Sequence, residues 1–131
     1  MKRLNGPERR CSGSYRTDYV LDECMSITDF LIRLHNIDGL TVNKIAVSED
    51  VDADVGMHRY GDEEYEPGEF RASFLHGGSW GTIITVKCDW KGEEIEFSMC
   101  FRDEAYSPFD KFSVWTESES TDFIMPEDFE L

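Results

Sequence analysis

The chain has 131 residues, of which 28 are acidic and 13 are Lys or Arg, so its formal charge at pH 7 is -15. This charge disfavours nucleic acid and anionic membranes as direct partners, and it favours a basic protein or a cation. The length is typical of a single domain, 1–131, and hydrophobic residues at 40% are enough for a core, which argues against disorder.

The first sixteen residues are basic, with five Lys or Arg residues against Glu8, and we expect them to form a flexible N-terminal segment. No apolar stretch follows them, so they do not resemble a secretory signal, and no run of the chain is long enough to cross a bilayer. The cysteines Cys11, Cys24, Cys88 and Cys100 lack the close spacing of zinc or redox motifs. We therefore expect reduced thiols and a cytoplasmic protein.

One helix is clearly marked in the first half of the chain. Ser26 and Asp29 form a capping-box pattern, which places a side-chain acceptor at the start of a helix. The apolar residues that follow recur at helical spacing and predict one buried stripe, made of Ile27, Phe30, Leu31 and Leu34. His35 suits the negative end of the helix dipole, and Gly39 is expected to end the helix.

Outside this helix, the sequence also indicates strands. Residues 40–48 predict a strand, and 111–116 predict another near the end of the chain. Residues 15–21 are ambiguous between a strand and the first turn of a helix. The last residues, 117–131, are acidic with scattered apolar side chains, and we expect a C-terminal tail that docks on the body or folds on a partner.

The middle of the chain predicts two hairpins. Alternating apolar residues at 70–76 and 80–90 pair around a short glycine loop, which sets Phe70 opposite Val86. Lys91-Gly92 then predicts a two-residue turn. Pairing around that turn gives three inward pairs and one outward pair: Cys88 with Ile95, Val86 with Phe97, Ile84 with Met99, and Lys87 with Glu96 outside. The predicted fold is α+β, an antiparallel sheet of four to five strands with one main helix packed on one face.

The most acidic stretch of the chain lies between Glu49 and Glu69. Its first aspartates alternate along the chain, and a denser acidic cluster with two tyrosines follows. Such a segment presents negative charge to a basic groove, and tyrosine supplies large contact area at low entropic cost. We therefore take ten residues as candidate partner-binding residues: Asp50, Asp52, Asp54, Tyr60, Asp62, Glu63, Glu64, Tyr65, Glu66 and Glu69.

The aspartates Asp50, Asp52 and Asp54 are also weak candidates for a metal site, because alternating carboxylates open a calcium-binding loop. Val55 and Gly61 stand where such a loop needs a glycine and a bidentate glutamate, so we expect no metal site. The chain has no nucleophile or ligand motif either. We therefore predict no catalytic residue, no cofactor and no enzymatic activity.

In size, acidity and lack of a catalytic motif, the whole chain resembles the small acidic inhibitors of phages and mobile elements. These include anti-CRISPR proteins that occupy the nucleic-acid channel of a CRISPR effector as DNA mimics. The chain is also similar to the immunity proteins that neutralise nuclease toxins. The resemblance implies a non-enzymatic inhibitor of a basic, nucleic-acid-processing protein, with the anti-CRISPR type ahead of the immunity type. The alternative of another class is a divalent-cation-binding or hydrolytic protein that uses the carboxylates of 50–66.

Overall fold

The computed structural model of the chain describes residues 1–10, 13–52, 57–58, 63–69, 82–101 and 109–117. Most of these residues lie in strands, and one helix occurs among them. In chain order the elements are β1 (Lys2–Arg9), β2 (Tyr15–Met25), α1 (Ile27–His35), β3 (Leu40–Asp52), β4 (Met57–His58), β5 (Glu63–Tyr65), β6 (Thr82–Trp90), β7 (Glu93–Phe101) and β8 (Phe109–Thr116).

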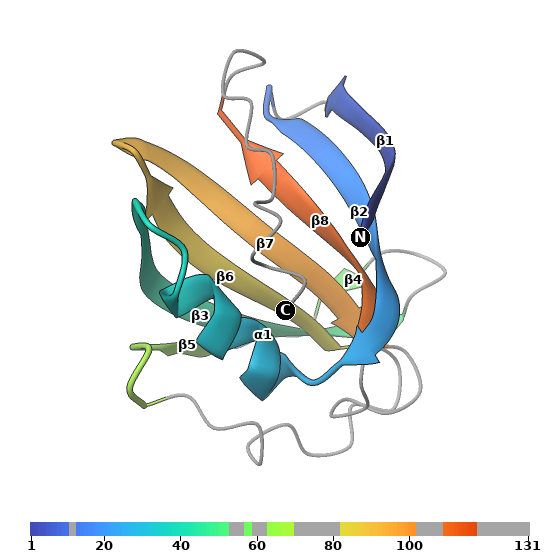
Figure 1. Ribbon diagram of the computed structural model, residues 1–131. Helices are drawn as coiled ribbons and strands as arrows, with labels where there is room; N and C mark the ends of the chain where they lie inside the picture. Colours follow the sequence, from blue (N-terminus) through green and yellow to red (C-terminus); the bar gives the residue numbers. More distant parts are fainter. Residues whose placement is uncertain (11–12, 53–56, 59–62, 70–81, 102–108, 118–131) are drawn as a thin grey trace.

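The strands lie side by side in antiparallel order, and α1 packs on one face of the sheet (Figure 1). From one edge to the other, the order is β1, β2, β8, β7, β6 and β3. The other side of β3 pairs with β5 at its middle and with β4 near its end. The long strand β3 therefore contacts both short strands that follow it in the acidic stretch of the chain.

The predicted fold class, α+β with four to five strands, is wrong, because the described residues lie mostly in antiparallel strands, with a single short helix among them. Part of the difference is β1, which lies at an edge of the sheet and has mostly exposed side chains. A strand exposed on both faces needs no alternation of apolar and polar residues, so its sequence carries no strand signal. The basic segment 1–16, expected to be flexible, contributes this edge strand and pairs with β2.

The helix begins as predicted. The Ser26 side chain accepts a hydrogen bond from the Asp29 backbone N–H at 3.1 Å, which satisfies one of the unpaired donors of the first turn. The helix ends earlier than Gly39, because Asn36 is its C-cap residue. Gly39 lies in the turn into β3 with a φ of +84°, a conformation that glycine adopts at little cost. Its carbonyl accepts a hydrogen bond from the Lys91 backbone N–H at 3.1 Å.

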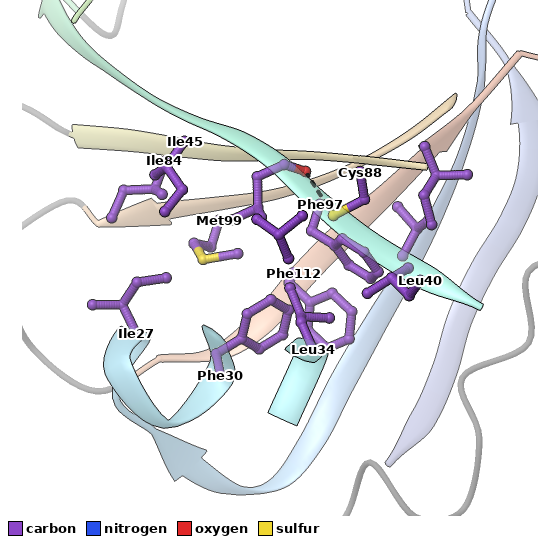
Figure 2. Close-up of a cluster of buried hydrophobic side chains, with 14 of the residues drawn as sticks. Ile27, Phe30, Leu34, Leu40, Ile45, Ile84, Cys88, Phe97, Met99 and Phe112 are labelled. Carbon is purple, nitrogen blue, oxygen red and sulfur yellow. Dashed lines mark hydrogen bonds between the residues drawn. The ribbon is translucent and has the colours of Figure 1, made fainter. Parts of the chain in front are cut away.

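The core lies between α1 and the inner face of the sheet, the face that carries the helix (Figure 2). Phe30 of the helix is 0% exposed, and its ring centre lies 5.2 to 5.7 Å from those of Phe97, Phe109 and Phe112 in edge-to-face packing. Such pairs stabilise the fold beyond the area they bury. Buried alternate residues of the central strands complete this core: Ile84, Val86, Cys88, Ile95, Met99 and Val114.

The hairpin of β6 and β7 confirms the predicted register around Lys91 and Gly92. These two residues have φ values of 48° and 87°, and positive φ at both central positions is typical of a type I′ turn. The three inward pairs and the outward pair of Lys87 with Glu96 all occur as predicted. Residues 15–21, which were ambiguous, lie in β2, where alternate side chains point to the core: Thr17, Tyr19 and Leu21.

The other predicted hairpin fails where it can be compared with the described residues. The segment 70–76 itself lies outside them. Val86 has Phe97 on one side and Ile45 of β3 on the other, so the position predicted for Phe70 is occupied by β3. The side chains predicted to point inward from β6 are therefore right, and the strand predicted beside it is wrong. The segment 40–48 is a strand as predicted, and so is 111–116.

Candidate functional site

The candidate partner-binding residues are spread over the β3 edge of the sheet. Asp54, Tyr60 and Asp62 lie outside the described residues. The others have three locations: Asp50 and Asp52 in β3, Glu63, Glu64 and Tyr65 in β5, and Glu66 and Glu69 in the turn that follows β5. The pairing of β3 with β5 brings the two parts of the acidic stretch together at one edge.

Two neighbouring candidates, Glu64 and Tyr65, lie on opposite faces of the sheet. Tyr65 pairs with the buried residue Ile45, and Glu64 pairs with Ala46. Successive side chains of a strand point to opposite faces of the sheet, so Tyr65 lies on the inner face and Glu64 on the outer face. A partner that binds one face of the sheet therefore contacts only one of these two side chains.

Glu64 is neutralised by two lysines from neighbouring strands. Its carboxylate lies 3.1 Å from Lys87 Nζ and 3.4 Å from Lys44 Nζ. The hydrogen bond and the charge of Lys87, followed by those of Lys44, hold the pKa of Glu64 below its ordinary value. This carboxylate is therefore engaged within the protein, which weakens its case as a contact for a basic partner.

A bulge in β3 explains why both lysines reach Glu64. The register of β3 against β6 shifts between Val42 and Lys44, so that Asn43 is an extra residue. The shift changes the parity of the strand, which lets Val42 and Ile45 both be buried. It also sets Lys44 opposite Lys87, with both side chains on the outer face.

The outer face also carries a polar network on β2 and β8. Arg16 lies over the Trp115 ring, with its guanidinium carbon 5.7 Å from the ring centre. Arg16 Nε lies 3.2 Å from Asp18 Oδ1, as an ion pair without hydrogen-bond geometry. Ser113 Oγ donates a hydrogen bond of 2.6 Å to the same Asp18 oxygen. Ser113 thus contacts Asp18, Asp18 contacts Arg16, and Arg16 contacts the Trp115 ring.

Beside Trp115, acidic side chains of β6, of β7 and of the residue that follows β8 gather in what we term the acidic corner: Asp89, Glu94, Glu96 and Glu117. Asp89 and Glu94 are direct cross-strand partners, and Glu96 is the partner of Trp115. Glu117 follows Thr116, the partner of Ile95, and therefore lies next to Glu94. Like charges placed directly opposite each other destabilise a sheet. Within the described ranges, no ion pair compensates the carboxylates of the acidic corner.

A pocket of about 470 Å³ opens on the outer face between Trp115 and the acidic corner. The lining includes Thr85, Ser98, Glu94, Glu96, Trp115 and Glu117. Its size falls in the range of about 300–1,000 Å³ that is common for ligand sites. We refer to it as the Trp115 pocket.

A second, smaller pocket of about 340 Å³ shares Glu94 and Glu96 with the Trp115 pocket and is lined by Lys44 and Lys87. The outer face thus has a basic part near β3 and an acidic, aromatic part near β8. In the basic part, Glu64 forms ion pairs with both Lys44 and Lys87. A cationic group fits the acidic part by charge, because both lysines form ion pairs with Glu64.

The cysteines differ in environment. Cys24 is exposed, whereas Cys88 is 1% exposed, and both are free thiols. Burial, followed by the charges of Asp89 and Glu96, raises the pKa of Cys88 to about 12, so this thiol is protonated at neutral pH. The Cys88 thiol lies 3.8 Å from the Val86 carbonyl oxygen, which fits a core residue. Cys11 and the side chain of Cys100 lie outside the described part of the chain.

In the part of the chain that the structure describes, no group of three or more His, Cys, Asp or Glu side chains is arranged to hold a metal ion. None of the helices in these same residues combines the length and the apolar character needed to cross a membrane.

The acidic corner and the Trp115 pocket are absent from the sequence prediction. One signal was present: the turn at Lys91-Gly92 sets Asp89 opposite Glu94, and this like-charge pair follows from the predicted register. No such signal predicted that Trp115 and Glu117 lie beside β7. The connection between β7 and β8 is longer than a two-residue turn, so it does not fix which residues of the two strands pair. Comparisons with protein families, with curated proteins and with solved structures found no match to this chain.

Proposed function

We propose that the protein is a non-enzymatic binding protein that uses its acidic surface to bind, and so to inhibit, a basic nucleic-acid-processing protein. The observation that carries the proposal is the cross-strand pair of Asp89 and Glu94, with Glu117 beside it. This arrangement costs folding stability, and a cationic partner compensates the cost by neutralising the charges.

The rest of the surface supports the same class of partner. The turn after β5 adds the exposed residues Glu66 and Glu69, and the whole chain carries a net charge of -15. Charge of this sign speeds the encounter with a basic surface and excludes acidic partners. The proposed targets are a CRISPR effector, ahead of a nuclease toxin, since both expose a basic channel or groove when no nucleic acid is bound.

The proposal is tested by measuring binding to purified CRISPR effectors and nuclease toxin domains between about 50 and 300 mM salt, over which the screening length falls from roughly 14 to 6 Å. A variant with Asp89→Asn, Glu94→Gln and Glu117→Gln should associate more slowly and with a weaker salt dependence. Inhibition of DNA cleavage by the bound target is the functional measurement.

Two further variants separate the possible binding surfaces. Glu66→Gln with Glu69→Gln tests the turn after β5, and Asp38→Asn with Asp110→Asn removes exposed charges elsewhere as a control. The control pair should bind as the unmodified protein does. Equal rates and equal salt dependence for all variants would mean that the acidic side chains only keep the protein in solution, and would overturn the proposal.

A further inference from the structure

We infer that the Trp115 pocket binds the guanidinium group of an arginine side chain that the basic partner presents. The inference rests on the proposed function, and it adds the chemical group that is recognised and the residues that recognise it. Arginine is favoured over lysine because its planar cation can stack on an aromatic ring while its edge donates hydrogen bonds to carboxylates.

The first support is the way in which the tryptophan ring is held. Arg16 lies over the Trp115 ring, and it is not one of the residues that line the Trp115 pocket. The ion pair of Arg16 with Asp18, and the hydrogen bond of Ser113 to Asp18, keep this guanidinium in place. The ring is thus fixed before any ligand arrives, which lowers the entropic cost of binding.

The second support is the position of the carboxylates relative to the ring. Glu96 is the cross-strand partner of Trp115, and Glu94 and Glu117 line the same pocket. A guanidinium stacked on the ring therefore has carboxylates within the same pocket for its N–H groups. Paired N–H donors facing a carboxylate are the strong geometry for arginine.

The third support is that the lysine opposite Glu96 forms an ion pair with another carboxylate. Lys87 is the cross-strand partner of Glu96, yet its ammonium lies 3.1 Å from Glu64. Glu64 is therefore a positioning residue: its ion pair with Lys87 competes with Glu96 for this cation and favours an incoming cation at Glu96. This role differs from the direct partner contact that the sequence predicts for Glu64.

The experiment compares capped octa-arginine and octa-lysine peptides, which carry equal charge, by titration calorimetry at one salt concentration. The unmodified protein should bind octa-arginine about tenfold more tightly than octa-lysine, since each 1.4 kcal/mol is a factor of ten. Trp115→Ala and, separately, Glu96→Gln should reduce arginine binding to the level of lysine binding. Trp115→Phe, which keeps an aromatic face, should restore part of the preference.

Because Trp115→Ala removes a half-buried side chain, its fold is checked by circular dichroism, and Glu96→Gln gives the same test without loss of volume. Equal affinity for the two peptides, unaffected by Trp115→Ala and Glu96→Gln, would overturn the inference. In that case, the variant with Asp89→Asn, Glu94→Gln and Glu117→Gln could still bind the target proteins more weakly than the unmodified protein does. The proposed function would then stand without arginine recognition in the pocket. Binding of neither peptide would overturn the inference, and the outcome of the target-protein measurement would then decide the proposed function by itself.

Discussion

The two faces of the sheet are built from the same strands, yet they are stabilised in different ways. On the inner face, Val86 and Phe97 are 0% exposed, and Phe30 of the helix packs on Phe97. On the outer face, half-buried and exposed polar side chains form ion pairs at Glu64 and Arg16, and Asp89 lies opposite Glu94 as a like-charge pair. The difference shows that stability comes mainly from the inner face, which leaves the outer face able to carry charges that oppose folding.

The largest expected effect is on the inner face. Val86→Asp and Phe97→Asp should each unfold the domain or cost several kcal/mol, because each buries a charge without a partner. Ile83→Asp changes the adjacent outer-face position and should cost much less, since Ile83 is only half-buried. Chemical denaturation of the three variants measures the difference. Equal losses for Ile83→Asp and Val86→Asp would mean that the two faces do not differ as described.

The helix should contribute the next largest effect. Phe30→Ala removes a ring that contacts Phe97 and Phe112, so we expect a loss of about 3–5 kcal/mol in the free energy of unfolding. Ile32 is 54% exposed on the opposite side of the helix, and Ile32→Ala should change stability by less than about 0.5 kcal/mol. A small loss for Phe30→Ala in the same denaturation assay would contradict the central place of this ring.

On the outer face, a substitution should have the opposite sign. Glu94→Gln removes the repulsion from Asp89 and should increase the free energy of unfolding by roughly 0.2–1 kcal/mol. The control Asp38→Asn removes an exposed charge in the turn before β3 and should leave stability nearly unchanged. Thermal unfolding at low salt measures both. A loss of stability in Glu94→Gln would show that this carboxylate is needed for folding.

The smallest expected effect is the pH dependence from Glu64. The lysines lower the pKa of this carboxyl in the folded state, so its contribution to stability is present at neutral pH and is lost as the pH falls below 4.5. The protein should therefore be slightly more stable than Glu64→Gln at pH 7, and the difference should disappear in acid. Lys87→Met should have a similar effect, because Lys87 is the main cause of the shift. An unchanged difference from pH 7 to pH 3 would contradict the ion pair.

Local signals predicted the parts of the fold that local physics specifies. The cap at Ser26, the buried stripe of α1 and the turn at Lys91-Gly92 are each set by residues close in the chain, and the structure confirms them. The alternation along β6 and β7 placed Val86 inward and Lys87 outward correctly. In strands without a bulge, such as β6 and β7, the side-chain period decides the face of the sheet on which a residue lies.

The neighbours of a strand were beyond such signals. The alternation that points Val86 inward is equally compatible with β3 or with the segment 70–76 as the neighbour of β6. The prediction chose 70–76, which is closer in the sequence, whereas the structure pairs β6 with β3. For the site, the charged residues around Glu64 were visible in the sequence, but their pairing with Lys44 and Lys87 depends on a bulge that the sequence pattern did not reveal.

The sequence by itself determined the acidity of the protein, the helix, the β6–β7 hairpin and the face that each hairpin residue takes, because these depend on composition and on short-range periodicity. Tertiary structure alone decided that Lys2–Arg9 forms an edge strand, that β3 lies beside β6, and that Trp115 joins the acidic corner. Those features arise from strands far apart in the chain, whose pairing depends on the total fit of the core.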